Sequence, residues 1–223
     1  MFRYIQVAID SIEQMTLLLR IPDYNIRKVI IQAILGFWES RPIESEIRRL
    51  KNPRTKERNF DFRSCSKEFH QHVIEQSKVV ETLVQAMSLM NHDGQIRLSI
   101  LCVLEKLTRH SELNSASFVT ANGAEYVALT IAEADKSCLL IVIDILWNAM
   151  EHGPKDQVIQ QMSTLTSVSS MHCAFLKLMK SSISTSDKQM RNDLLVLFIH
   201  LARANPSAPF VETNFLTDII DFG

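Results

Sequence analysis

Glycine and proline are scarce in this chain, and so are cysteine and tryptophan. Its 223 residues include five Gly, six Pro, four Cys and two Trp. So few turn-forming residues argue against a β-sandwich, and the dispersed glycines cannot build a phosphate-binding loop. The cysteines form no Cys-x-x-Cys pair, which argues against a disulfide scaffold and indicates a reducing compartment.

A strong net charge and a long apolar run are also missing. The formal net charge is −1, which gives no bias toward nucleic acid or an anionic membrane. The best apolar run, Cys138 to Trp147, is interrupted by Asp144 and is far shorter than the roughly 20 residues of a membrane span. Arg3, Asp10 and Glu13 rule out a signal peptide at the N-terminus. We therefore expect a cytoplasmic protein that does not enter a membrane.

The abundant pattern is a short phrase that opens with Asp and precedes an apolar helical run. It occurs four times, beginning at Asp23, Asp93, Asp135 and Asp187. An Asp at the N-cap accepts hydrogen bonds from free backbone N–H groups, and the apolar residue three positions later faces the core. Two of the three intervals lie near the armadillo/HEAT period of about 40–47 residues, and the first is longer. The pattern predicts an all-α, armadillo/HEAT-like right-handed solenoid of about four repeats.

Three of the four phrases place an arginine four residues after the Asp. These are Arg27, Arg97 and Arg191. A cation near a helix N-terminus interacts mildly unfavourably with the helix dipole, so its recurrence calls for another cause. We expect each arginine to form a salt bridge with its own Asp or with the neighbouring repeat. Partner binding is the alternative.

Breaks in the helical pattern divide the chain. We expect a helical hairpin at 1–40, a flexible basic insert at 41–66 and armadillo-like repeats over 67–223. The repeats should span about 67–110, 111–153 and 154–205, with a further one starting at 210–223. The chain stops within that helical start, so we expect a fragment of a longer solenoid.

The insert is a run of positive charge with few apolar positions. The basic residues that crowd together in it are Arg48, Arg49, Lys51, Arg54, Lys56, Arg58 and Arg63. Such a run is usually a solvated loop, and contact with a partner is the alternative. Nucleic-acid binding is a weaker possibility, because the only aromatic residues near the basic ones are Phe60 and Phe62.

Several stretches carry a resemblance to known proteins. The Gly123-Ala124 turn, followed by Ile145 to Met150, resembles the armadillo signature. The chain also resembles the cilia- and flagella-associated protein sixty-nine family. The stretches that carry this second resemblance are Leu17 to Pro22, Leu83 to Met90, Ile145 to Asn148, Val158 to Leu165, Gln189 to Leu195 and Ala204 to Pro209. They follow the family's order, and departures lie mainly at 41–66 and at Leu98 to Thr120.

The resemblance implies a non-catalytic scaffold of motile cilia and sperm flagella. Members of the family are associated with the central apparatus of the axoneme, so other ciliary proteins are the expected partners. The alternatives are an import-like adaptor that binds peptides and a nucleic-acid-binding repeat protein. We expect no catalytic residue, cofactor, metal or small-molecule substrate.

Two residue groups could be mistaken for chemical sites. Cys65, His70 and His72 lie close together, but a structural zinc site needs four ligands and no fourth candidate is near. His172 and Cys173 are adjacent, and adjacent helical residues point in different directions. We expect Cys173 to be buried and His172 to lie at the boundary of the core.

The last helix of each repeat offers candidate positions for a partner. Nuclear-import armadillo proteins line their concave groove with a ladder of Trp and Asn. The Asn position here is filled by Gly36, Lys106, Asn148 and His200, so the ladder is missing. We propose Lys106, Asn148 and His200 as partner-facing residues, and their variety favours a specific protein over a repetitive peptide.

The charge run generates the first testable prediction. Residues 44–63 bury too little apolar area to offset their ordering entropy, so their deletion should leave the rest of the chain folded. Chemical denaturation of the deletion variant should retain one cooperative transition. Loss of cooperativity would show that the insert packs against the repeats.

Overall fold

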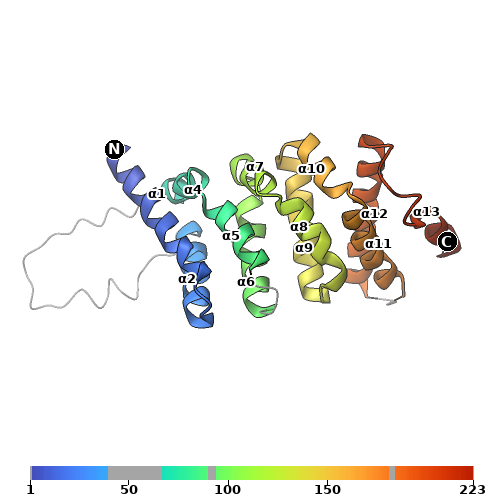
Figure 1. Cartoon of the computed structure of the whole chain (residues 1–223), viewed down its shortest axis with the longest axis horizontal. Coiled ribbons are helices and arrows are strands. Elements are labelled where there is room, and N and C mark those ends of the chain that lie inside the picture. Colours follow the sequence, from blue (N-terminus) through green and yellow to red (C-terminus); the bar gives the residue numbers. More distant parts are fainter. Residues whose placement is uncertain (1, 40–66, 90–93, 181–183, 223) are drawn as a thin grey trace, which may run out of the picture.

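The computed structural model describes residues 2–39, 67–89, 94–180 and 184–222. The basic insert and Asp93 therefore lie outside the described residues, and the expectations for them stay predictions. Throughout the described ranges the regular structure is helical and contains no strand, which confirms the all-α expectation. The helices stack side by side along one axis, with the two termini at opposite ends (Figure 1).

The helices follow each other as one hairpin and three sets of three. The hairpin is α1 (Phe2–Leu17), the 3₁₀ turn η1 (Leu18–Arg20) and α2 (Tyr24–Trp38). The first two sets are α4 (Lys67–Glu75), α5 (Val79–Ser88) and α6 (Gly94–Thr108), then α7 (Glu112–Thr120), α8 (Gly123–Thr130), η2 (Ile131–Glu133) and α9 (Lys136–His152). The last set is α10 (Lys155–Met162), α11 (Leu165–Lys180) and α12 (Thr185–Ala204), after which comes α13 (Phe215–Phe222). The order matches that of the predicted units, whose boundaries stay predictions.

Two of the predicted N-caps are present. The Asp23 carboxylate accepts a hydrogen bond of 2.9 Å from the Ile26 backbone N–H at the start of α2. The Asp135 carboxylate accepts one of 2.8 Å from the Cys138 N–H at the start of α9. Each Asp has extended backbone angles, as an N-cap requires.

The prediction for Asp187 is wrong, because Ser184 caps α12. The Ser184 hydroxyl accepts from the Asp187 N–H at 3.1 Å, which places Asp187 in the first helical turn. Its carboxylate instead lies 2.7 Å from the Lys136 ammonium at the start of α9. Lys136 also donates to the Ser184 hydroxyl at 2.9 Å. The Lys136 ammonium lowers the pKa of Asp187, and hydrogen bonding to Ser184 lowers it further.

The arginines do not form the expected ion pairs with described carboxylates. Arg27 donates through Nε to the backbone carbonyl of Leu19 at 3.0 Å, which ties α2 to η1. Arg191 approaches the Met179 sulfur at 3.9 Å and ties α12 to α11. A neutral acceptor within the same unit therefore replaces the expected carboxylate at both positions. The pairing of Arg97 with Asp93 remains a prediction.

Gly123 has a packing reason for its place after the α7 helix. A Cβ at this position would overlap the ring and the backbone carbonyl of Phe118. Asn122, just before it, adopts a left-handed conformation with φ of 59°, which lets the chain reverse between α7 and α8. The turn thus brings the two short helices together around a fully buried Phe118.

The last helix of each unit forms one continuous layer. Helix α6 packs against α2 on one side and α9 on the other, and α9 then packs against α12. We call α2, α6, α9 and α12 the closing helices; Figure 1 shows them succeeding one another along the stack. Helices α1, α5, α8 and α11 pack behind them, with the short α4, α7 and α10 alongside. The main contacts join elements of one unit or of two neighbouring units.

The core runs along the stack between these layers. Helices α5, α6 and α9 contribute the largest sets of buried apolar residues. The buried apolar residues of α6 and α9 are Ile96, Ile100, Leu101, Val103, Leu104 and Leu107, together with Leu139, Val142, Ile143, Ile145, Leu146 and Ala149. Their spacing of three and four residues puts them on one side of each helix. One polar bond crosses from α8 to α5, where the Tyr126 hydroxyl donates to the Met87 carbonyl at 2.8 Å.

An aromatic cluster attaches α13 to the last full unit. Phe198 and Phe215 have ring centroids 4.1 Å apart, and the ring of His172 lies 5.2 Å from that of Phe215. His172 Nε2 is 3.0 Å from a carboxylate oxygen of Asp218. Burial lowers the pKa of His172, and Asp218 opposes this effect. The expectation for the His172–Cys173 pair is therefore wrong: His172 is buried by α13, and Cys173 is exposed.

The layered core predicts that replacing Leu146 by Ala lowers the free energy of unfolding much more than the same replacement at Leu140 on the same helix. Leu146 is fully buried on α9, and Leu140 is 41% exposed. Leu146→Ala should lower the free energy of unfolding by about 2–5 kcal/mol, whereas Leu140→Ala should lower it by less than about 1 kcal/mol. Chemical denaturation measures both. Equal effects would show that α9 is not central to the core.

Candidate protein interaction face

The exposed sides of the closing helices form one surface along the stack, which we call the closing-helix face. Lys106, Asn148 and His200 lie on α6, α9 and α12 respectively. Each is partly or largely exposed, and each also contacts the closing helix that precedes its own. These contacts show how the face is built.

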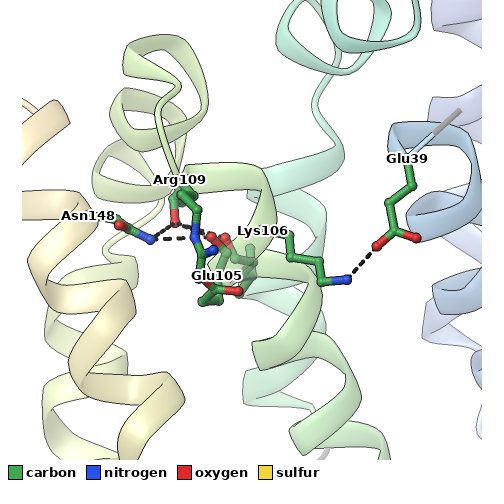
Figure 2. A network of polar contacts seen from close by, with 7 residues as sticks. Glu39, Glu105, Lys106, Arg109 and Asn148 are labelled. Atoms are coloured by element: carbon green, nitrogen blue, oxygen red, sulfur yellow. Dashed lines mark hydrogen bonds and ion pairs between the residues drawn. The ribbon is translucent and has the colours of Figure 1, made fainter. Parts of the chain in front are cut away.

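Lys106 connects α6 to α2. Its ammonium forms an ion pair and hydrogen bond with the Glu39 carboxylate, which belongs to the C-cap of α2. Figure 2 shows the Lys106 side chain extending from α6 toward Glu39. The Lys106 side chain stays 41% exposed, so its contribution to stability is modest.

Asn148 connects α9 to α6 in the same way. Its Nδ2 donates to the Glu105 backbone carbonyl at 3.3 Å and to the Thr108 hydroxyl at 3.2 Å. Figure 2 shows the amide pointing toward the last turn of α6. Because both bonds use Nδ2, the amide oxygen is the polar atom of Asn148 for which the structure gives no acceptor bond.

His200 connects α12 to α9 through its ring. The His200 ring stands nearly perpendicular to that of Trp147, at 86°, with centroids 5.8 Å apart. Edge-to-face packing of this kind is a favourable aromatic geometry. The three residues proposed as partner-facing therefore share one geometric rule: each reaches back to the preceding closing helix.

A polar depression of the face lies between α6, α9 and α12. It is an open depression of about 480 Å³, which we call the acidic depression. Its lining residues are Glu105, Arg109, His110, Asp144, Trp147, Asn148 and Asp193. Three of them are carboxylates and one is a guanidinium, so negative charge is in excess.

The carboxylates of the acidic depression differ in their partners. Glu105 is buried on α6 and pairs with Arg109, which directly follows the end of that helix. Asp193 accepts a hydrogen bond of 2.8 Å from the Gln189 amide on its own helix. Asp144 is half-buried and has no ion pair or hydrogen bond from any described side chain.

The surroundings of Asp144 disfavour its negative charge. Burial raises the pKa of Asp144, and the carboxylates of Glu105 and Asp193 raise it further, while Arg109 opposes them. The sequence contains one sign of this site, since Asp144 is the only charge within the apolar run of α9. The approach of Glu105 and Asp193 from two other helices is visible only in the folded chain.

A second depression adjoins the first at Arg109 and His110. It has a volume of about 430 Å³ and lies between the end of α2, α4 and the end of α6. Its remaining lining residues are Trp38, Glu39, Lys67, Gln71, Glu75, Lys106 and Ser111. Ser111 donates to the Glu75 carboxylate at 2.7 Å. Acidic and basic groups alternate here, so this depression has no comparable charge excess.

Cysteine and histidine residues form no chemical centre in the part of the chain that the structure describes. Burial raises the pKa of the thiols of Cys102 and Cys138, which makes both poor nucleophiles. Among the described residues, no group of three or more His, Cys, Asp or Glu is placed to hold a metal ion. None of the described helices combines the length and apolar character that a membrane span needs.

Comparison with known proteins identifies the family. A family model for the armadillo repeat of cilia- and flagella-associated protein 69 matches residues 2–223. The chain belongs to this family. The match confirms the armadillo-type solenoid and the resemblance described from the sequence.

Curated proteins of the same name align with nearly the whole chain. Cilia- and flagella-associated protein 69 of Papio anubis is 29% identical over 221 residues, which is 98% of this chain. The human protein is also 29% identical and the mouse protein 26%, both over the same share. The chain spans 22% of the length of each relative. No solved structure matches it.

The crowding of carboxylates generates a prediction for Asp144→Asn. A folded-state pKa above the unfolded value means that the ionised carboxylate costs stability once the pH exceeds these pKa values. At neutral pH the substitution should therefore raise the free energy of unfolding, by less than about 1 kcal/mol because the group is half exposed. The gain should vanish as the pH falls through the raised pKa of Asp144, where the native carboxyl becomes neutral.

The matched control for this substitution is Asp10→Asn on α1. Asp10 accepts a hydrogen bond of 2.7 Å from Gln6, four residues earlier, and it is exposed. Asp10→Asn should produce no gain at any pH. Thermal unfolding followed across the acidic to neutral range compares the two variants. A loss of stability in Asp144→Asn at neutral pH would show that the carboxylate has a stabilising partner.

Proposed function

We propose that this chain is a non-catalytic armadillo-type scaffold module that binds other proteins in motile cilia and flagella. The observation that carries the proposal is the family match over residues 2–223. Stacked helices with a long exposed face suit binding of an extended partner surface. The names of the curated relatives connect those proteins with cilia and flagella, and we extend that association to this chain.

The proposed place of action is the axoneme. A scaffold of the central apparatus, acting in flagellum assembly or stability, is the specific role that we infer from the family resemblance. The protein would be made in the cytoplasm and retained in the cilium by protein contacts. Other axonemal proteins are its proposed partners.

The proposed working surface is the closing-helix face. Lys106, Asn148 and His200 occupy the positions that face the groove in armadillo proteins, and all three remain partly exposed. Their contacts with the preceding helix hold them in fixed positions, so a partner would meet a preorganised surface. The described lining of the acidic depression offers carboxylates, an amide and rings, without a nucleophile beside a base. That inventory suits binding better than covalent chemistry.

Localisation in ciliated cells tests the proposed function. The chain with a fluorescent tag should remain on axonemes after detergent extraction, and the tag alone should wash out. His200→Ala should weaken the axonemal signal, because it alters the face. Gln160→Ala, an exposed position on α10, should leave the signal unchanged. A signal that is diffuse or nuclear and is removed by detergent would reject the ciliary role while leaving the solenoid intact.

A further inference from the structure

The acidic depression is part of a helix face that no described element covers. On α9, Leu140, Asp144 and Trp147 follow one another at spacings of four and three residues, so they share one side of the helix. On α12, Asp193 and Val196 are related in the same way. Leu140 and Val196 are 41% and 40% exposed. Apolar and acidic groups therefore alternate on one accessible surface.

We propose that this surface binds a Lys/Arg-rich segment of a partner protein. The inference rests on the proposed function and specifies the chemistry of its partner. Three carboxylates converge on the depression, and one guanidinium, already paired with Glu105, is the nearest opposing charge. A cationic side chain entering the depression supplies the countercharge that Asp144 and Asp193 lack. An acidic partner would be repelled, so charge complementarity selects the occupant.

Trp147 makes the site more selective than a simple charge patch. Its indole lines the depression, is half-buried and is held by the perpendicular ring of His200. A fixed indole beside carboxylates can bind the guanidinium or ammonium group through a cation–π interaction. Leu140 and Val196 then provide apolar contact for the aliphatic part of a long basic side chain.

The amide of Asn148 presents a hydrogen-bond acceptor to a partner. Its Nδ2 is engaged by Glu105 and Thr108, so its oxygen is available as an acceptor at the rim of the depression. Acceptors therefore dominate the surface, with Arg109 as the main donor. A partner rich in N–H donors matches this arrangement.

Fluorescence anisotropy with a labelled hexa-arginine peptide tests the inference on the purified chain. The wild type should bind this peptide and should not bind a labelled hexa-glutamate peptide. Asp144→Asn and Asp193→Asn should each weaken hexa-arginine binding by about 3- to 10-fold. Asp10→Asn is the matched control, because Gln6 bonds to Asp10 as Gln189 bonds to Asp193, and it should leave the affinity unchanged.

A second readout locates the peptide. Hexa-arginine should change the intrinsic tryptophan emission of the wild type, and Trp147→Phe should abolish the change while Trp38 is retained. No binding by the wild type, or equal weakening by all three Asp→Asn variants, would overturn the proposal. Binding that appears only after deletion of 44–63 would also overturn it, because the chain's own basic segment would then be the occupant.

The two proposals fail separately. A chain that binds hexa-arginine at Trp147 without remaining on axonemes would keep the inferred partner chemistry and lose the ciliary role. A chain that remains on axonemes without binding the peptide would lose only the inferred chemistry.

Discussion

Packing between successive closing helices is the contact on which the whole molecule depends. Helices α2, α6, α9 and α12 each bury one side against the core and meet their neighbours along the stack. In a solenoid no contact reaches beyond the next unit, so stability is a chain of nearest-neighbour terms. Side chains of the same helices join one unit to the next across three interfaces, through Lys106, Asn148 and His200.

The side chains of the closing-helix layer have two roles, since they join neighbouring helices and also form the exposed surface. A side chain that fixes the spacing of two helices is also a side chain that a partner meets. Asn148 illustrates this, because its nitrogen holds α6 while its oxygen is left at the rim of the acidic depression. Burial of Glu105 and crowding of Asp144 follow from the same close approach of α6, α9 and α12. Structure and recognition are therefore set by one group of contacts.

Local rules in the sequence predicted the helices and two of their caps. Asp23 and Asp135 cap their helices because the rule involves only the next three residues. The prediction that Asp187 caps α12 was wrong because Ser184 is an equally good N-cap. Which of the two residues caps the helix depends on Lys136 in the preceding unit, which contacts both. The burial of His172 depends on the docking of α13, which no local pattern reports.

Contacts between residues far apart in the sequence could not be predicted from local patterns either. Glu39 and Lys106 are separated by 67 positions, and nothing in either segment indicates the other. The three proposed face positions were found by analogy with armadillo proteins. Their bonds to the preceding helix came from geometry, as did the convergence of Glu105, Asp144 and Asp193.

The backward direction of the bonds between closing helices has a consequence for synthesis of the chain. A ribosome releases the earlier helix of each neighbouring pair first, and each later closing helix carries a side chain whose partner has already emerged. Lys106 pairs with Glu39, Asn148 donates to the end of α6, and His200 packs against Trp147. Each closing helix can therefore dock through these three contacts once it has left the exit tunnel. These contacts favour assembly of the closing-helix layer in the order of synthesis.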